Sequence, residues 1–399
     1  MHAFREMDGS RPLDQLVSIV RNQMLDVPLA GLPVDLDEQL PMLSALARRH
    51  LVVPALHDAL ASALPTDHPA AIELENAHVM SIGNHLRILA DLARLAPLLE
   101  STGARWAVLK GPVLAEVFYP RPDLRSYDDL DVLVEPGRLG DVVDALEASG
   151  AHLLDVNWPL IRSSGRGEIT LVLWHGTVLD LHWDLITEQA VRSSFRLDAS
   201  DLLDRRRQVG VASITVPTLG RGDTLTHVGL HALLAGGDRL GWLADLAAIM
   251  QRDGALTTLD WKRTEEQRCT LAVAIMLDRL ERVLGDPNAS ASLATAPRTP
   301  AWRRLLARSD RVRPPESFPG RLSMRLLARS TRGSTRASVA AVFRSVWEEV
   351  GTPVLHRTNP WGKRPSVQDD VANPLWIANG TAVDRQECFR EIAEASSRA

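Results

Sequence analysis

Two aspartates, Asp129 and Asp131, are separated by one apolar residue in the run DLDVLVEP. Residues two apart on a β-strand point to the same side and lie about 6 to 7 Å apart along the backbone. Two carboxylates in that position beside a buried strand need a cation between them to stay ionised at low cost. Mg²⁺ suits such a pair because it takes oxygen ligands and bridges to phosphates. A turn followed by a solvent-facing strand residue is the simpler interpretation of the same spacing.

Two neighbouring stretches favour the metal interpretation. Upstream, the run WAVLKGP predicts a strand that ends at Lys110 and Gly111 before a helix, an arrangement in which backbone N–H groups face a phosphate. Downstream, the run VLDLHWDL places Asp180 on another predicted strand, with His182 and Asp184 on the same side. A third carboxylate on a neighbouring strand would complete a two-metal cluster. His182 could contact a substrate from there, although a histidine at such a place is more often structural.

The apolar spacing around these residues predicts a mixed α+β fold, with a small mixed sheet between helical regions. Residues 13–101 carry apolar side chains at helical spacings. These spacings predict helices near 13–24, 37–49 and 54–63 and a long helix from residue 69. Residues 103–217 predict a core of four or five strands. The expected regions are an N-terminal helical region (1–102), the catalytic core (103–217), a helical region on the core (218–284), a linker (285–301), an Arg-rich helical region (302–352) and an irregular tail (353–399).

Composition limits the class of protein. Of the 399 residues, 45% are hydrophobic and 24% charged, as in ordinary soluble domains, and the formal charge of -5 argues against non-specific coating of nucleic acid. The two cysteines, Cys269 and Cys388, exclude a disulfide framework and fit a reducing compartment. The start, MHAFREMDGSRPLDQ, lacks an apolar signal segment, and no run of about 18 apolar residues occurs. We therefore expect a cytoplasmic protein with no membrane partner.

The run LKGPVLAEVFYPRPDLRSYDDLDVLVEP resembles the signature block of the uncharacterised nucleotidyltransferase-like family, part of the DNA polymerase β nucleotidyltransferase superfamily. The runs VLDLHWDL and LTHVGLHALLAGGDRLGWLADLAAIM are similar to that family's later strand motif and its helical segment. The resemblance covers residues 10–280. It implies a Mg²⁺-dependent transfer of a nucleoside monophosphate from an NTP to an acceptor, with release of pyrophosphate. Mn²⁺ is the alternative metal.

The resemblance also implies roles for individual residues. The metal ligands and catalytic carboxylates would be Asp129, Asp131 and Asp180. Of these, Asp180 would orient or deprotonate the acceptor. The nucleotide-binding residues would be Lys110, Gly111, Arg125 and His182. Much of the superfamily has Gly-Ser at this turn, whereas this chain has Gly111-Pro112, which supplies neither a hydroxyl nor an N–H. Triphosphate binding would then depend more on Lys110.

Two predicted helices after the core carry further candidates. His227 and His231 lie four apart on one helix, so both could face a metal, but the intervening residues provide no glutamate of the zinc-protease type. His231 and Asp245, on successive helices, are expected to form a hydrogen-bonded pair beneath the active site. Such a pair would orient a ligand or only satisfy its own polar groups.

Residues 303–344 hold eleven arginines against two acids, at spacings of three and four that make one helical face basic. That face could bind an acidic or phosphorylated acceptor or nucleic acid, or it could simply be solvated. Two other functions stay open. One is a toxin-like or peptide-modifying transferase that acts on tRNA, a protein or a ribosomal peptide. The other is a non-catalytic nucleotide-binding protein.

Overall fold

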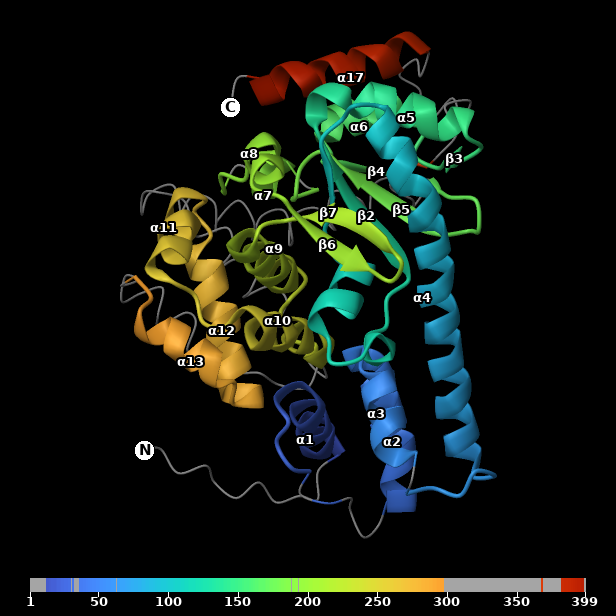
Figure 1. Ribbon diagram of the computed structural model, residues 1–399, viewed down its shortest axis with the longest axis vertical. Coiled ribbons are helices and arrows are strands. Elements are labelled where there is room, and N and C mark those ends of the chain that lie inside the picture. Colours follow the sequence, from blue (N-terminus) through green and yellow to red (C-terminus); the bar gives the residue numbers. More distant parts are fainter. Residues whose placement is uncertain are drawn as a thin grey trace, which may run out of the picture.

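The computed structural model of the chain describes residues 12–29, 31, 36–61, 63–187, 189–192, 194–297, 367–368 and 382–397. Its N-terminal part is helical, as expected. The four helices there are α1 (Pro12–Leu25), α2 (Leu36–His50), α3 (Val53–Leu60) and α4 (Pro69–Ser101). The 33-residue α4 runs along one side of the molecule (Figure 1). It begins with Pro69, whose missing N–H costs nothing in a first turn, and the His68 ring caps it by accepting from the Ala70 N–H at 3.2 Å.

Seven strands form one mixed sheet in the order β3-β4-β5-β2-β1-β7-β6. The strands are β1 (Trp106–Val108), β2 (Asp129–Val134), β3 (His152–Leu153), β4 (Glu168–Val172), β5 (Val178–His182), β6 (Arg207–Val211) and β7 (Ile214–Thr218). The mixed α+β class is confirmed, but four or five strands was too few. The β6–β7 hairpin escaped notice because each strand has only five residues and neither alternates clearly: β6 has one buried residue, and β7 ends in three consecutive buried residues.

Strand β2 lies at the centre of the sheet and separates two cores. Its residues Leu130, Val132 and Val134 belong to the large hydrophobic core, whereas Leu133, on the same side as the aspartates, packs in a smaller cluster with Leu202 and Leu203. β2 runs antiparallel to β1 and parallel to β5. Strand β1 therefore brings the Lys110 turn to one side of β2, and β5 brings Asp180 to the other side.

Short helical segments connect the strands. They are η1 (Leu114–Phe118, a π-helix), the 3₁₀ turns η2 (Pro122–Leu124) and η3 (Pro136–Arg138), α5 (Leu139–Ala148), α6 (Trp158–Ser164), α7 (Gln189–Arg192) and α8 (Ala199–Asp204). Five further helices follow the sheet and lie across it from α4 (Figure 1). They are α9 (Arg221–Leu234), α10 (Leu240–Asp253), α11 (Thr258–Glu266), α12 (Thr270–Leu284) and α13 (Pro287–Ala294).

Two expectations about the C-terminal part are wrong. Residues 287–294, expected to be part of a linker, form α13, which packs on α12. Within the expected irregular tail, α17 (Ala382–Ser397) is a helix that packs on η3, α5 and α6 (Figure 1). The Arg-rich region 302–352 lies outside the described residues, and the domain boundaries stay a prediction. Among the described helices, none is both long and apolar enough to cross a membrane.

Candidate active site

Three carboxylates converge where β2 and β5 run side by side. The parallel register places Asp131 directly beside Asp180, and Asp129 lies two residues earlier on the same side of β2. Ligand oxygens of the three residues all lie within 4.8 Å of one another. Hard oxygen donors at this spacing are typical ligands of Mg²⁺ and Mn²⁺. The pairing of two strands thus brings together residues that are far apart in the sequence.

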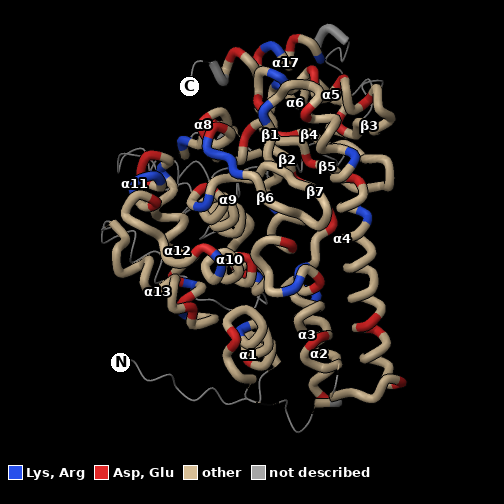
Figure 2. The backbone as a smooth tube through the Cα atoms, viewed as in Figure 1, with Lys and Arg blue, Asp and Glu red and all other residues tan. Residues whose placement is uncertain are grey.

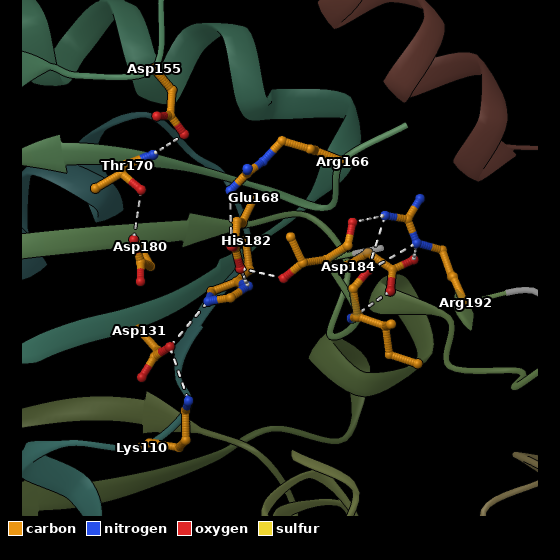
Figure 3. A network of polar contacts seen from close by, with 12 residues as sticks. Lys110, Asp131, Asp155, Arg166, Glu168, Thr170, Asp180, His182, Asp184 and Arg192 are labelled. Atoms are coloured by element: carbon orange, nitrogen blue, oxygen red, sulfur yellow. Dashed lines mark hydrogen bonds and ion pairs between the residues drawn. The ribbon is translucent and has the colours of Figure 1, made fainter. Parts of the chain in front are cut away.

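Asp131 is the centre of a polar network (Figure 3). Its Oδ1 lies 3.2 Å from Lys110 Nζ and 3.2 Å from His182 Nε2, and its side chain is only 5% exposed. Burial by itself would raise the pKa of Asp131. The Lys110 ammonium and the His182 hydrogen bond nevertheless hold that pKa well below its usual range. Asp131 is therefore an ionised carboxylate with a cationic group already beside it.

Asp129 and Asp180 show the opposite tendency. Burial and the charge of Asp131 raise the pKa of Asp129. Burial raises the pKa of Asp180 to about 6, despite a 2.8 Å hydrogen bond from Thr170 Oγ1. Three converging carboxylates, two of which resist ionisation, fit a divalent cation, because the ion would remove the repulsion and favour their charged forms.

The Lys110–Gly111 turn is held closely against β2. Gly111 has a φ of +53°, and a Cβ at this position would lie 3.3 Å from the Asp129 carbonyl oxygen and 3.3 Å from the Tyr127 ring. Glycine alone meets both the left-handed backbone and the close approach without strain. The Leu109 N–H donates to the Asp131 carbonyl at 3.0 Å, which holds the start of the turn beside the carboxylates.

The helix expected after Gly111 is short. Residues 112–118 are helical, the last five of them as the π-helix η1, and the chain leaves the helix at Tyr119, whose backbone is extended. The following residue, Pro120, disfavours a helical conformation for Tyr119, which explains where the segment ends. This segment begins directly after Gly111, as expected, but it has only about two turns and a small dipole, and a contact of its N-terminus with a phosphate stays a prediction.

Arg125, expected to neutralise a triphosphate, is engaged by the protein itself. Its Nε and Nη2 donate to Asp245 Oδ1 and Oδ2 at 2.7 and 3.0 Å, and its Nη1 donates to the Gly111 carbonyl at 3.3 Å. The Tyr119 hydroxyl donates to Asp245 Oδ1 at 2.8 Å. The Arg125 and Asp245 side chains are each 10% exposed. Arg125 therefore joins the Gly111 turn to α10, and its charge is balanced by Asp245.

The expected hydrogen bond between His231 and Asp245 is not formed, because Asp245 accepts from Arg125 and Tyr119 instead. The Lys110 charge, together with burial, lowers the pKa of His231 to about 3. Burial and the same charge lower the pKa of His227 well below its usual value, and the His227 Nε2 has no hydrogen-bond partner. Two neutral imidazoles of α9 thus lie on the Lys110 side of the site.

Two residues of β4 join the network, and the sequence prediction missed both. The antiparallel register sets Glu168 opposite His182 and Thr170 opposite Asp180. Glu168 Oε2 lies 3.2 Å from His182 Nδ1 (Figure 3). Burial lowers the pKa of His182, but the hydrogen bond to Asp131 and the charges of Asp131 and Glu168 raise it overall. The alternating polar residues of the run EITLV were a signal for a polar strand face, but only the pairing of β4 with β5 shows what that face meets.

A cavity of about 930 Å³ lies beyond the end of β5 and is lined by residues of α6, α8, α11 and α17. Trp183 and Asp184 line it, and none of the three converging aspartates does. Asp184, on the same strand side as His182 in the sequence pattern, lies at this cavity and pairs with Arg192 at 3.0 Å. The carboxylate site and the cavity are therefore separate places in the fold.

Comparisons with known proteins agree with the resemblance seen in the sequence. A family model described as "Uncharacterised nucleotidyltransferase" matches residues 37–285. One similar solved structure is that of an antigenic nucleotidyltransferase-like protein from Paracoccidioides brasiliensis. It is 14% identical, the match covers 51% of this chain and 93% of that chain, and the TM-score is 0.28, too low to carry an argument. No curated protein matches the chain.

Proposed function

Because the chain belongs to the uncharacterised nucleotidyltransferase family, we propose that it is a metal-dependent enzyme that transfers a nucleoside monophosphate from an NTP to an acceptor hydroxyl. The observation that carries the proposal is the convergence of Asp129, Asp131 and Asp180 within 4.8 Å beside the Lys110–Gly111 turn. In the reaction, a bond forms between the acceptor oxygen and the α-phosphorus. The bond from that phosphorus to the bridging oxygen breaks, and pyrophosphate leaves.

The three aspartates are the residues that would hold the metal, and Mg²⁺ or Mn²⁺ fits their oxygen donors. When bound, such an ion supplies positive charge to the triphosphate and to the attacking oxygen. Asp131 is suited to anchor it because its carboxylate is buried, ionised and oriented by His182. Glu168 supports His182 from the other side.

Asp180 is suited to accept the proton of the acceptor hydroxyl. Its pKa of about 6 lies close to neutral pH, where a general base combines a large ionised fraction with useful basicity. Thr170 Oγ1 donates to Asp180 Oδ1 at 2.8 Å, which orients the carboxylate and leaves Oδ2 available. The proton would therefore go to Asp180 as the new ester bond forms.

Lys110 is the cationic side chain placed to contact the triphosphate. Its ammonium lies 3.2 Å from Asp131, and its side chain is 14% exposed, so it is held at the site and still accessible to a ligand. Pro112 contributes no N–H to this turn, and the Arg125 charge is balanced by Asp245. Lys110 is consequently the residue on which phosphate binding depends most.

Release of pyrophosphate tests the proposal. The protein is incubated with each NTP, Mg²⁺ and panels of hydroxyl-bearing acceptors, and pyrophosphate is measured with a coupled assay. Asp129→Asn, Asp131→Asn and Asp180→Asn should each reduce the rate by about 100-fold or more. Asp128→Asn is the matched control, because Asp128 is exposed and bonds Asn84 instead of the site. It should keep the wild-type rate.

Two results would contradict the proposal. If the Asp131→Asn protein releases pyrophosphate as fast as the wild type, the carboxylate site is not the active site. If the wild-type protein binds NTP tightly with Mg²⁺ in calorimetry but turns over none with any acceptor, the protein is a nucleotide-binding protein rather than a transferase.

A further inference from the structure

The outward side of α4 is apolar where a solvent-facing helix is usually charged. Ile72, Val79, Met80 and Leu86 are exposed by 48, 54, 70 and 59%. The elements that contact α4 pack on its other side, which carries the buried residues of the helix. Between Glu75 and Arg87 the helix has no acidic residue, lysine or arginine, and Figure 2 shows this uncharged stretch. An exposed apolar surface of this kind marks an interaction site.

The exposed side of α4 also repeats every seven residues. Six exposed positions recur at spacings of four and three, as in the seam of a coiled coil. They are Ile72, Asn76, Val79, Gly83, Leu86 and Ala90. Large apolar residues thus alternate with smaller ones. A Cβ added at Gly83 would meet nothing within 4 Å, so no contact within the described chain requires this poor helix former.

We propose that this face binds the same face of a second copy of the chain, with the two α4 helices antiparallel. The seam of a coiled coil is formed by two positions of the heptad, a and d. In an antiparallel pair, an a residue of one helix packs beside a d residue of the other. One register pairs all six seam residues in this way. It places Ile72 beside Ala90, Val79 beside Gly83, and Leu86 beside Asn76 of the second copy. Each large side chain then meets a smaller one. Because the pairing has two-fold symmetry, every contact occurs twice.

The same register pairs the charges along the edge of the seam. It brings Glu73 of each copy next to Arg87 of the other, and Met80 next to Met80. Within the described part of the chain Arg87 has no ion pair, and its Nε is buried without a hydrogen-bond partner. Glu73 is largely exposed, and among the described residues its only ion pair is the surface contact with Arg48. A carboxylate from the second copy would give the Arg87 guanidinium the acceptor it lacks.

A parallel pair fits the same residues poorly. It would set Gly83 against Gly83 and Ala90 against Ala90, which leaves gaps between the layers of large side chains. It would also place Arg87 beside Ile82 instead of an acid. The side chains therefore favour the antiparallel arrangement.

The area of the seam suits a reversible dimer. The four large side chains, exposed by 48 to 70%, present about 400 Å² per protomer, so complete burial of both sets would remove about 800 Å² from water. The smaller seam residues and the two charge pairs bring the total to roughly the 1,000 Å² that a specific interface requires. The dimer should thus form at micromolar concentrations and dissociate on dilution.

Sedimentation equilibrium of the full-length protein tests the pairing. At about 50 µM the wild-type chain of 43.8 kDa should sediment as a dimer of twice that mass. Gly83→Leu fills the space that Val79 of the second copy needs, and should weaken the dimer about tenfold or more. The variant should still fold, because leucine is the better helix former. Leu259→Ala is the control: Leu259 is 63% exposed on α11, far from the seam in the chain, and its loss should leave the mass unchanged.

Charge reversal tests the register. Arg87→Glu places a second acidic side chain beside Glu73 of the other copy at both ends of the seam, and should weaken the dimer. The double variant Glu73→Arg/Arg87→Glu restores opposite charges at both ends and should restore the dimer. Neither residue belongs to the proposed active site, so this test does not depend on pyrophosphate release. Failure of the double variant to recover wild-type dimerisation would contradict the pairing of Glu73 with Arg87.

Disulfide trapping separates the two orientations. Under mild oxidation Met80→Cys should cross-link two antiparallel copies, whereas Leu86→Cys would cross-link parallel ones. The native Cys269 and Cys388 are buried and give a low background. A cross-link through Leu86→Cys but not through Met80→Cys overturns the antiparallel arrangement. A wild-type protein that stays monomeric at about 50 µM overturns the dimer altogether.

Discussion

Replacing Arg125 by methionine should cost about 3 to 5 kcal/mol of folding free energy, the loss that follows when one partner of a buried ion pair is removed. The guanidinium makes two short hydrogen bonds to Asp245 and a longer one to the Gly111 carbonyl. Both side chains are only 10% exposed, so solvent screens the pair little and Asp245 would be left buried without its cation. Methionine replaces much of the arginine stem, so the loss reports the ion pair more than a cavity.

Urea unfolding followed by circular dichroism measures this loss. With an m value of about 3 kcal/mol/M, the midpoint should fall by about 1 M or more. Asp245→Asn should cost a similar amount, and the double variant Arg125→Met/Asp245→Asn should cost clearly less than the sum, a coupling of about 2 kcal/mol. Arg121→Met is the control. Arg121 is half exposed, and its ion pairs with Asp58 and Asp123 should contribute about 1 kcal/mol at most.

Two results would refute this reasoning. An additive double variant would show that Arg125 and Asp245 do not stabilise each other. A wild-type urea midpoint for Arg125→Met, combined with weaker NTP binding, would show that Arg125 contacts the triphosphate instead of holding the Gly111 turn.

Two further outcomes follow from the site. Mn²⁺ affinity measured by calorimetry should fall as the pH drops below about 6, because the pKa of Asp180 is about 6 and a protonated carboxyl does not bind metal. The fall should approach tenfold per pH unit from Asp180 alone, and the raised pKa of Asp129 should add to it. An affinity that does not change between about pH 5 and pH 7 would exclude Asp180 as a ligand. Gly111→Ala should destabilise the protein by about 1 to 2 kcal/mol in thermal unfolding, because of its positive φ and the contact with Tyr127. Gly137→Ala, where a Cβ meets nothing within 4 Å, should change little, and equal effects of the two substitutions would contradict the close approach.

The spacing of residues along each strand was sufficient to predict which side chains of the candidate site share a strand side. A period of two places Asp129 and Asp131 on one side of β2, whatever the neighbours of that strand are, and the same period places Asp180 and His182 on one side of β5. Helical spacing in the same way predicted the N-terminal helices and the start of α4 at Pro69. Properties of this kind depend only on residues close together in the chain.

Local spacing failed where the outcome depended on packing. The small residues of 287–294 suggested a linker, but Asp286 caps a helix there by accepting from the Ala289 N–H at 2.8 Å, and that helix packs on α12. The partner of Arg125 could not be predicted for a similar reason, because Asp245 lies on α10, far away in the chain. An arginine near a phosphate-binding turn looks available until its partner is known.

The spacing of residues along the chain specifies which side chains share a face of each strand and helix. Which of these faces meet depends on how the elements pack. The contact between Asp131 and His182 spans 51 positions, and the contact between Arg125 and Asp245 spans 120. The order of strands in the sheet and the packing of α10 against the Gly111 turn set those contacts. No spacing within a short run can specify them, because partners so distant in the chain are chosen by the burial of whole elements against one another.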